Sequence, residues 1–171
     1  ELTRDGRMLL PIVTGDLASA EVMQSAKDLS ELLGKISGAK FSIETGDGGR
    51  GIVMGRASDF ANLPFAQTFD SGAFHREDYV LRTEADGLYL LGASDLAVSH
   101  AVWDLLHRLG YRQFFAGATW AIIPTQPNLT VEIDAYEAPD FGSRRIWYNW
   151  GYNMCPISSG ACGTEQPRDS G

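Results

Sequence analysis

The chain has 171 residues, of which 44% are hydrophobic and 21% charged, a balance typical of one globular domain that needs neither a metal nor a disulfide to fold. Its formal net charge of −8, with lysine and arginine scattered along the chain, argues against a nucleic-acid partner because a polyanion would be repelled. No apolar run approaches the roughly 20 residues that cross a bilayer, so we expect no membrane-spanning segment.

The first part of the chain predicts a strand followed by an amphipathic helix. Residues 8–13 form a short apolar run, in which Pro11 favours a strand end or an edge position because proline has no N–H to donate. From Ser19 onward apolar side chains recur every three or four residues, and Gly38 is placed to cap the helix that they predict. Within this helix Gly34 favours either close packing or an early end. The apolar stripe comprises Val22, Met23, Ala26, Leu29, Leu33 and Ile36.

Two short strands are predicted next, at 41–44 and 51–55, and the second is apolar throughout, as in strands buried on both faces. The glycine-rich stretch 46–49 lies between them. A phosphate-binding loop would continue into a lysine-serine or lysine-threonine pair and a helix, whereas here Arg50 and an apolar strand follow. We therefore interpret the stretch as a turn and expect no cofactor. Residues 56–76 show no sustained period, which indicates a loop with one helical turn.

The next part of the chain predicts a hairpin, a second helix and further strands. Residues 78–83 alternate in polarity, and Glu84-Ala85-Asp86-Gly87 predicts a hairpin turn with Asp-Gly at its tip before a partner strand at 88–91. Ser94 is suited to cap the start of a helix that ends at Gly110. The inner stripe of this helix comprises Val98, Ala101, Val102, Leu105 and Leu109. Three extended segments follow, at 111–115, 120–123 and 129–133.

These elements predict an α+β domain over residues 1–140, with a mixed β-sheet of about six or seven strands and two main helices packed on it. The composition changes after Pro139. Residues 141–171 open with an aromatic run and continue with serine, glycine, proline and polar residues, too poor in apolar side chains to order themselves. We expect this segment to be either the truncated start of a second domain or a disordered tail.

Four aromatic residues in that segment are the best candidates for ligand contact: Trp147, Tyr148, Trp150 and Tyr152. Aromatic faces stack on the apolar faces of sugar rings, so the run is a candidate carbohydrate contact. The alternative is that the same side chains pack in the core of a following domain. The residues alone leave both interpretations open.

The two cysteines, Cys155 and Cys162, lie close together near the end of the chain. In an exported protein they predict a small disulfide loop, and otherwise two unpaired thiols. A metal site needs further ligands, and no histidine lies near them in sequence, so we expect no metal.

Nothing in the chain predicts a catalytic centre. His100 and His107 lie two helical turns apart, about 10 Å, too far to share a ligand, and His75 stands apart from both. Pairs of acidic residues occur only near strand ends and turns, where solvated carboxylates are common. No Gly-x-Ser-x-Gly nucleophile motif is present. We therefore expect no catalytic residue in this chain.

Several short motifs resemble the N-terminal domain of alpha-glucuronidases and of related barrel-bearing proteins. The helix end and the strand after it are similar to the family's first helix and short buried strand, and the later hairpin, helix and strands follow its order. The junction at Pro139-Asp140-Phe141 resembles the point where the family's (β/α)₈ barrel begins. The motifs are Leu33-Gly34-Lys35-Ile36-Ser37-Gly38-Ala39-Lys40, Gly51-Ile52-Val53-Met54-Gly55, residues 79–110, Tyr111-Arg112-Gln113-Phe114-Phe115 and Ile122-Ile123-Pro124.

The resemblance implies a domain like domain 2 of beta-N-acetylhexosaminidases, which is non-catalytic and buttresses the barrel. The catalytic acids would then lie beyond Gly171, so no catalytic residue carries over to this chain. We expect an accessory domain of a glycoside hydrolase-like protein, secreted or periplasmic after removal of a leader, whose partners are its own C-terminal barrel and a polysaccharide. The alternatives are a carbohydrate-binding module that uses the aromatic run at 147–152, and a small enzyme whose site the sequence does not reveal.

Overall fold

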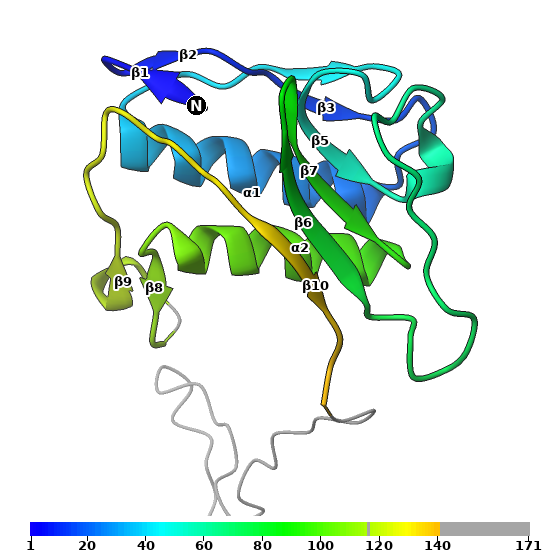
Figure 1. Cartoon of the computed structure of the whole chain (residues 1–171). Coiled ribbons are helices and arrows are strands. Elements are labelled where there is room, and N and C mark those ends of the chain that lie inside the picture. The colour runs from blue at the N-terminus through cyan, green and yellow to red at the C-terminus, as the bar shows by residue number, and fades with distance from the viewer. Residues whose placement is uncertain (116, 141–171) are drawn as a thin grey trace, which may run out of the picture.

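A computed structural model of the chain describes residues 1–115 and 117–140, which form one mixed sheet with two helices on one of its faces (Figure 1). The strand order is β10-β6-β7-β5-β3-β4; β3, β4, β5 and β7 run parallel to one another, and β6 runs antiparallel to both β7 and β10. The strands are β3 (Ile12–Thr14), β4 (Ile43–Thr45), β5 (Gly51–Gly55), β6 (Tyr79–Glu84), β7 (Gly87–Gly92) and β10 (Asp134–Glu137).

The helices are α1 (Ala20–Ser37) and α2 (Asp95–Arg108), with short 3₁₀ turns η1 (Ala57–Asp59) and η2 (Ala118–Trp120). Two small two-stranded sheets lie outside the main sheet. One pairs β1 (Thr3–Arg4) with β2 (Arg7–Met8), and the other pairs β8 (Arg112–Gln113) with β9 (Ala121–Ile122). No helix among the described residues is both long and apolar enough to cross a membrane.

Both helices begin and end where the sequence predicts. The Ser19 hydroxyl accepts the N–H of Val22 at 3.2 Å, and the Ser94 hydroxyl accepts the N–H of Ala97 at the same distance, so each helix has a side-chain cap. Gly38 closes α1 in the left-handed conformation, with φ of 79° and its N–H donated to the carbonyl of Gly34. These local contacts satisfy backbone groups that a helix end otherwise leaves unpaired.

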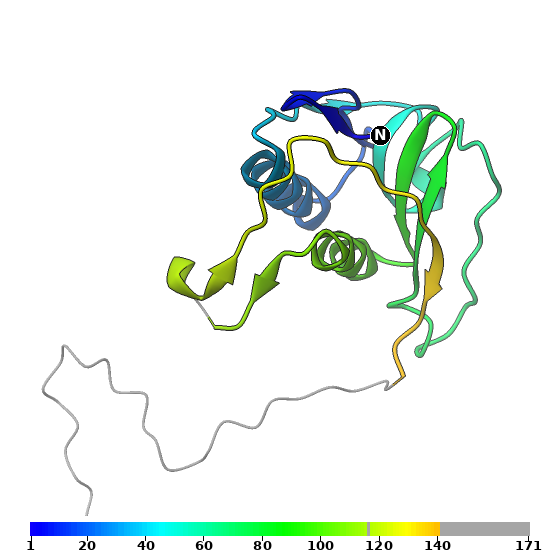
Figure 2. The same cartoon turned by 60° about the vertical axis from the view of Figure 1, so that its left-hand side comes forward.

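The sheet separates two apolar clusters. The larger lies between the sheet and the helices, and its sheet side chains include Ile52, Met54, Leu88 and Leu90. The smaller lies on the other face and is covered by the long segment 56–78, which Figure 2 shows passing along the sheet away from the helices. The second cluster comprises Val13, Val53, Phe60, Tyr89 and Leu91. Because alternate residues of β5 and β7 serve the two clusters, both strands are apolar throughout.

The close pairing of β5 with β7 requires a glycine. Gly51 and Gly87 are register partners at the start of this parallel pair. A Cβ built on Gly87 would lie 2.4 Å from the carbonyl oxygen of Gly51, much closer than such atoms can approach. Gly87 therefore starts β7, and the turn of the β6–β7 hairpin is Ala85-Asp86, not the predicted Asp-Gly pair.

The predicted α+β fold class is confirmed, including the six-stranded mixed sheet and the two helices. The loop at 56–76 contains the one helical turn expected, η1, and α1 continues past Gly34 to Ser37. Pro11 precedes β3 and so lies at a strand end, while β3 itself is an inner strand.

Three local predictions were wrong. The last strand is Asp134–Glu137, not 129–133, because residues 129–133 divide their hydrogen bonds between the N-terminal segment and Thr83 and follow no single neighbour. The segments at 111–115 and 120–123 pair only in part, and with each other outside the main sheet. Leu109 is half-buried, and Leu106 takes the core position.

Candidate functional site

The residues singled out from the sequence lie outside the part of the chain that the structure describes. This holds for the aromatic candidates Trp147, Tyr148, Trp150 and Tyr152, and for Cys155 and Cys162. The carbohydrate contact and the disulfide therefore stay predictions.

The acidic residues that the sequence pairs are engaged mainly in surface ion pairs. Asp134 accepts from Arg82 at 2.8 Å on neighbouring strands, and Glu137 accepts from Arg108 at 2.8 Å. Exposed ion pairs of this kind contribute roughly 0–1 kcal/mol each to stability. In residues 1–115 and 117–140 no group of three or more histidine, cysteine, aspartate or glutamate side chains is arranged to hold a metal ion.

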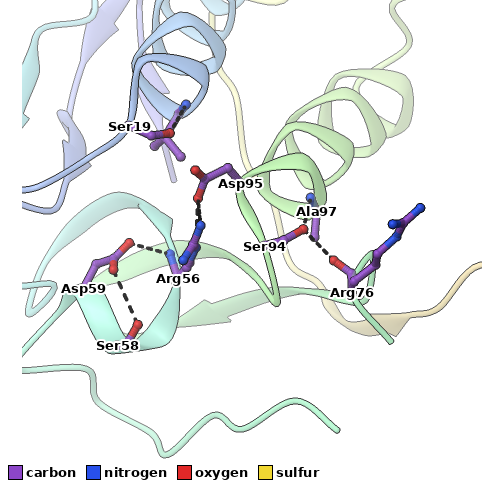
Figure 3. A network of polar contacts seen from close by, with 9 residues as sticks. Ser19, Arg56, Ser58, Asp59, Arg76, Ser94, Asp95 and Ala97 are labelled. Carbon is purple, nitrogen blue, oxygen red and sulfur yellow. Dashed lines mark hydrogen bonds and ion pairs between the residues drawn. The ribbon is translucent and has the colours of Figure 1, made fainter. Parts of the chain in front are cut away.

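A polar network joins the starts of the two helices (Figure 3). Arg56 extends from the end of β5 to Asp95 in the first turn of α2, with an Nη2–Oδ1 distance of 2.7 Å. The backbone N–H of Arg56 donates to Asp59, and the Ser94 hydroxyl donates to the carbonyl of Arg76. The drawn side chains thus find partners within the protein, and the network ties the 56–78 segment to α2.

Asp78 is the one buried carboxylate among the described residues, and sequence reasoning missed it. Its Oδ2 accepts the hydroxyl of Tyr136 on β10 at 2.6 Å and lies 2.9 Å from Nδ1 of His75. Its Oδ1 has no hydrogen-bond partner within the described residues. Burial, followed by the hydrogen bond to Asp78, raises the pKa of Tyr136 to about 12. The alternation of the strand was the available signal, because Asp78 precedes buried Val80 by two residues.

A second polar group lies where β10 leaves the sheet beside α2. Arg108 bridges Asp104, at 3.0 Å, and Glu137. Burial and then the negative charge of Asp104 raise the pKa of Tyr79 above its ordinary value. A hollow of about 330 Å³ opens here, lined by Glu77, Tyr79, His100, Glu137, Ala138 and Pro139. We call this hollow the exit hollow, since the described chain ends beside it.

The largest group of exposed apolar side chains surrounds the β8–β9 hairpin. Figure 1 and Figure 2 show this hairpin standing away from the sheet, below α2 and on the same side as the end of β10. Exposure of its large side chains runs from 42% for Trp103 on α2 to 66% for Phe115. We call this surface the hairpin face, and it comprises Trp103, Phe114, Phe115, Trp120 and Ile122.

The geometry of the described residues favours association over catalysis. The polar groups are paired with one another and tie secondary-structure elements together, while the hairpin face presents apolar side chains to solvent. Patches of this kind mark surfaces that other protein segments cover. The histidines agree with the structural or surface role expected of them, since His75 pairs with Asp78, and His100 lies 3.8 Å from Glu77.

Comparison with known proteins finds a likeness in structure alone. No protein-family model matches the sequence, and no curated protein matches it. Among solved structures, a family GH115 4-O-methyl-alpha-glucuronidase with specificity for decorated arabinogalactans matches with a TM-score of 0.56 at 19% identity. The match covers 80% of this chain and 18% of that enzyme. The fold of this chain therefore occurs as a small part of a much longer alpha-glucuronidase.

Proposed function

We propose that residues 1–140 form a non-catalytic accessory domain of a glycoside hydrolase-like protein, and that they buttress a catalytic barrel beginning near residue 141. The observation that supports this most directly is the fold match, in which most of this chain corresponds to less than a fifth of an alpha-glucuronidase. A module of that relative size leaves the greater part of such an enzyme to other domains. We further propose that the protein is secreted or periplasmic, where polysaccharide substrates are met.

The chemistry of the described residues supports the non-catalytic role. Glycoside hydrolysis needs two carboxylates held roughly 5–10 Å apart across a sugar, in a site that the sugar can enter. Asp78 is buried and engaged by Tyr136 and His75, and Glu137 is bound by Arg108. Both carboxylates tie parts of the fold together, so a supporting role uses them as they stand.

Hydrolysis assays on the chain test the proposal. Incubated with aryl alpha-glucuronides and aryl N-acetyl-beta-glucosaminides, the 171-residue chain should release no aryl group above a buffer blank. Release that persists through purification and is lost with heat denaturation would make this chain an enzyme and would refute the accessory role.

The supporting role has its own experiment. The coding sequence downstream of residue 171 would be expressed with and without residues 1–140, and the melting temperature of the downstream domain compared. We expect the version without residues 1–140 to melt several degrees lower or to be insoluble, because an accessory domain covers apolar surface of its neighbour. Equal melting temperatures would show that residues 1–140 support nothing.

The carbohydrate-binding alternative is separated by calorimetry. Titration with glucuronoxylan and chitin fragments should give no saturable heat if residues 1–140 only support a neighbour. Saturable heat that disappears in the Trp147→Ala, Trp150→Ala double variant would instead favour a binding module that uses the aromatic run.

A further inference from the structure

The hairpin face is a preformed aromatic surface. The N–H of Phe114 donates to the carbonyl of Trp120 at 3.1 Å, and the rings of Phe115 and Trp120 meet edge to face with centroids 5.0 Å apart. At the base of the hairpin Tyr111 is buried, and its ring lies against Trp103 at 6.0 Å. These contacts hold the hairpin in shape while its aromatic side chains remain exposed, an arrangement that favours a covering partner because burial of apolar surface is stabilising.

The described chain ends on the same side of the domain as this surface. The ion pair between Arg108 and Glu137 joins β10 to the last turn of α2, and β8 begins four residues after Arg108. Both views place the hairpin and the end of β10 below α2 (Figures 1 and 2). Seven to twelve extended residues span roughly 25–40 Å, and a 14-residue helix is only about 21 Å long. The residues that directly follow Asp140 can therefore reach the hairpin along the surface.

The chemistry of those residues complements the surface. Ile146-Trp147-Tyr148-Asn149-Trp150 is an apolar run that matches the aromatic hairpin face. Arg144 and Arg145 precede it, and the exit hollow beside their path contains Glu77 and Glu137. Residues 1–140 hold all but two of the chain's 22 acidic side chains and all but three of its 14 basic ones, so the domain attracts a basic segment.

We propose that residues 144–152 of this chain dock on the hairpin face, with the arginines at the acidic exit hollow and Trp147 and Trp150 against the exposed aromatic side chains. The inference rests on the proposed supporting role and deepens it, because it names the surface through which the support is given and the first segment that receives it. The occupant is the same chain, so docking is intramolecular and independent of protein concentration.

Hydrogen exchange on the full 171-residue chain tests the docking. In the Trp147→Ser, Trp150→Ser variant we expect backbone amides of residues 112–122 to exchange on the order of tenfold faster than in the unchanged chain, because the cover is lost. The reciprocal variant, Phe115→Ser with Trp120→Ser, should speed exchange in residues 146–152. Phe74→Ser is the matched control, since Phe74 is equally exposed but lies in the 56–78 segment; exchange of 112–122 and 146–152 should not change.

Two results would overturn the proposal. One is unchanged exchange at residues 112–122 in the Trp147→Ser, Trp150→Ser variant. The other is a concentration-dependent dimer, seen by light scattering, that dissociates in the Trp120→Ser variant, because the face would then be covered by a second copy. Either result leaves the accessory role standing, whereas hydrolysis by the chain would refute that role and leave the docking intact. The two proposals therefore fail separately.

Discussion

The hydroxyl of Tyr136 donates a 2.6 Å hydrogen bond to the carboxylate of Asp78, which is fully buried at the start of β6. The bond joins the edge strand β10 to its neighbour, and His75 brings the end of the 56–78 segment to the same oxygen. One carboxylate thus holds three parts of the chain together at the point where β10 ends. The contact is structural, and its strength can be measured.

Tyr136→Phe should lower the free energy of unfolding by about 1–3 kcal/mol, because it removes a partner from a buried carboxylate whose other oxygen has none within the described residues. Urea denaturation measures the difference. Tyr111→Phe is the matched control: its hydroxyl donates to the exposed Gln113, so we expect a loss below about 1 kcal/mol. Equal losses in the two variants would show that Asp78 does not depend on Tyr136.

Stability should fall at alkaline pH. The pKa of Tyr136 is raised in the folded protein to about 12 from 10.0. Since the folded state holds this proton more tightly, its contribution is complete below about pH 10 and is lost as pH rises toward 12. Burial raises the pKa values of Tyr79 and Tyr89 in the same direction.

Melting temperatures across this range, for the unchanged chain and for Tyr136→Phe, test the alkaline prediction. The variant should lose less stability between about pH 10 and 12, because one of the shifted groups is gone. Tyrosinate absorbance should show the corresponding late titration in the folded chain. Parallel curves for the two proteins would contradict the assignment to Tyr136.

Gly87→Ala should destabilise the fold by about 1–3 kcal/mol or more, since the new methyl group would meet the Gly51 carbonyl at 2.4 Å in the middle of the sheet. Gly49→Ala is the control, because its nearest neighbour lies at 3.4 Å, an ordinary contact. Thermal unfolding compares the two. A Gly87→Ala variant as stable as Gly49→Ala would mean that β5 and β7 are not paired in this register.

Leu105→Ala should cost about 2–5 kcal/mol, because Leu105 is fully buried between α2 and the sheet and its truncation leaves a cavity. Leu96 lies on the same helix but is 47% exposed, so Leu96→Ala should cost below about 1 kcal/mol. Chemical denaturation of both variants places α2 on the sheet as described. Similar costs would mean that α2 packs through a different face.

Much of the fold could be predicted because its signals are local. Ser19 with Gly38, and Ser94 with Gly110, mark helix ends through contacts within a few residues. Apolar spacing of 3.6 residues predicts the buried faces of both helices, except at Leu109, where the helix ends and the side chain leaves the core. The short apolar strand at 51–55 and the hairpin after it follow from composition and turn residues.

The candidate surface could not be predicted, since it depends on contacts between distant residues. Asp78 meets Tyr136 across 58 positions, and Arg108 meets Glu137 across 29. The β8–β9 hairpin has the alternation and aromatic content of a sheet strand, and only its place outside the sheet leaves Phe115 and Trp120 exposed. The aromatic run at 147–152, which the sequence makes prominent, lies outside the described residues.

By itself, then, the amino-acid sequence determined the secondary-structure elements and the fold class, because caps, turns and apolar periods act over a few neighbouring residues. The tertiary structure alone decided the strand order, the burial of Asp78 and the exposure of the hairpin face. Those features depend on which segments the chain brings together, and that choice is made by the burial of the whole apolar surface at once.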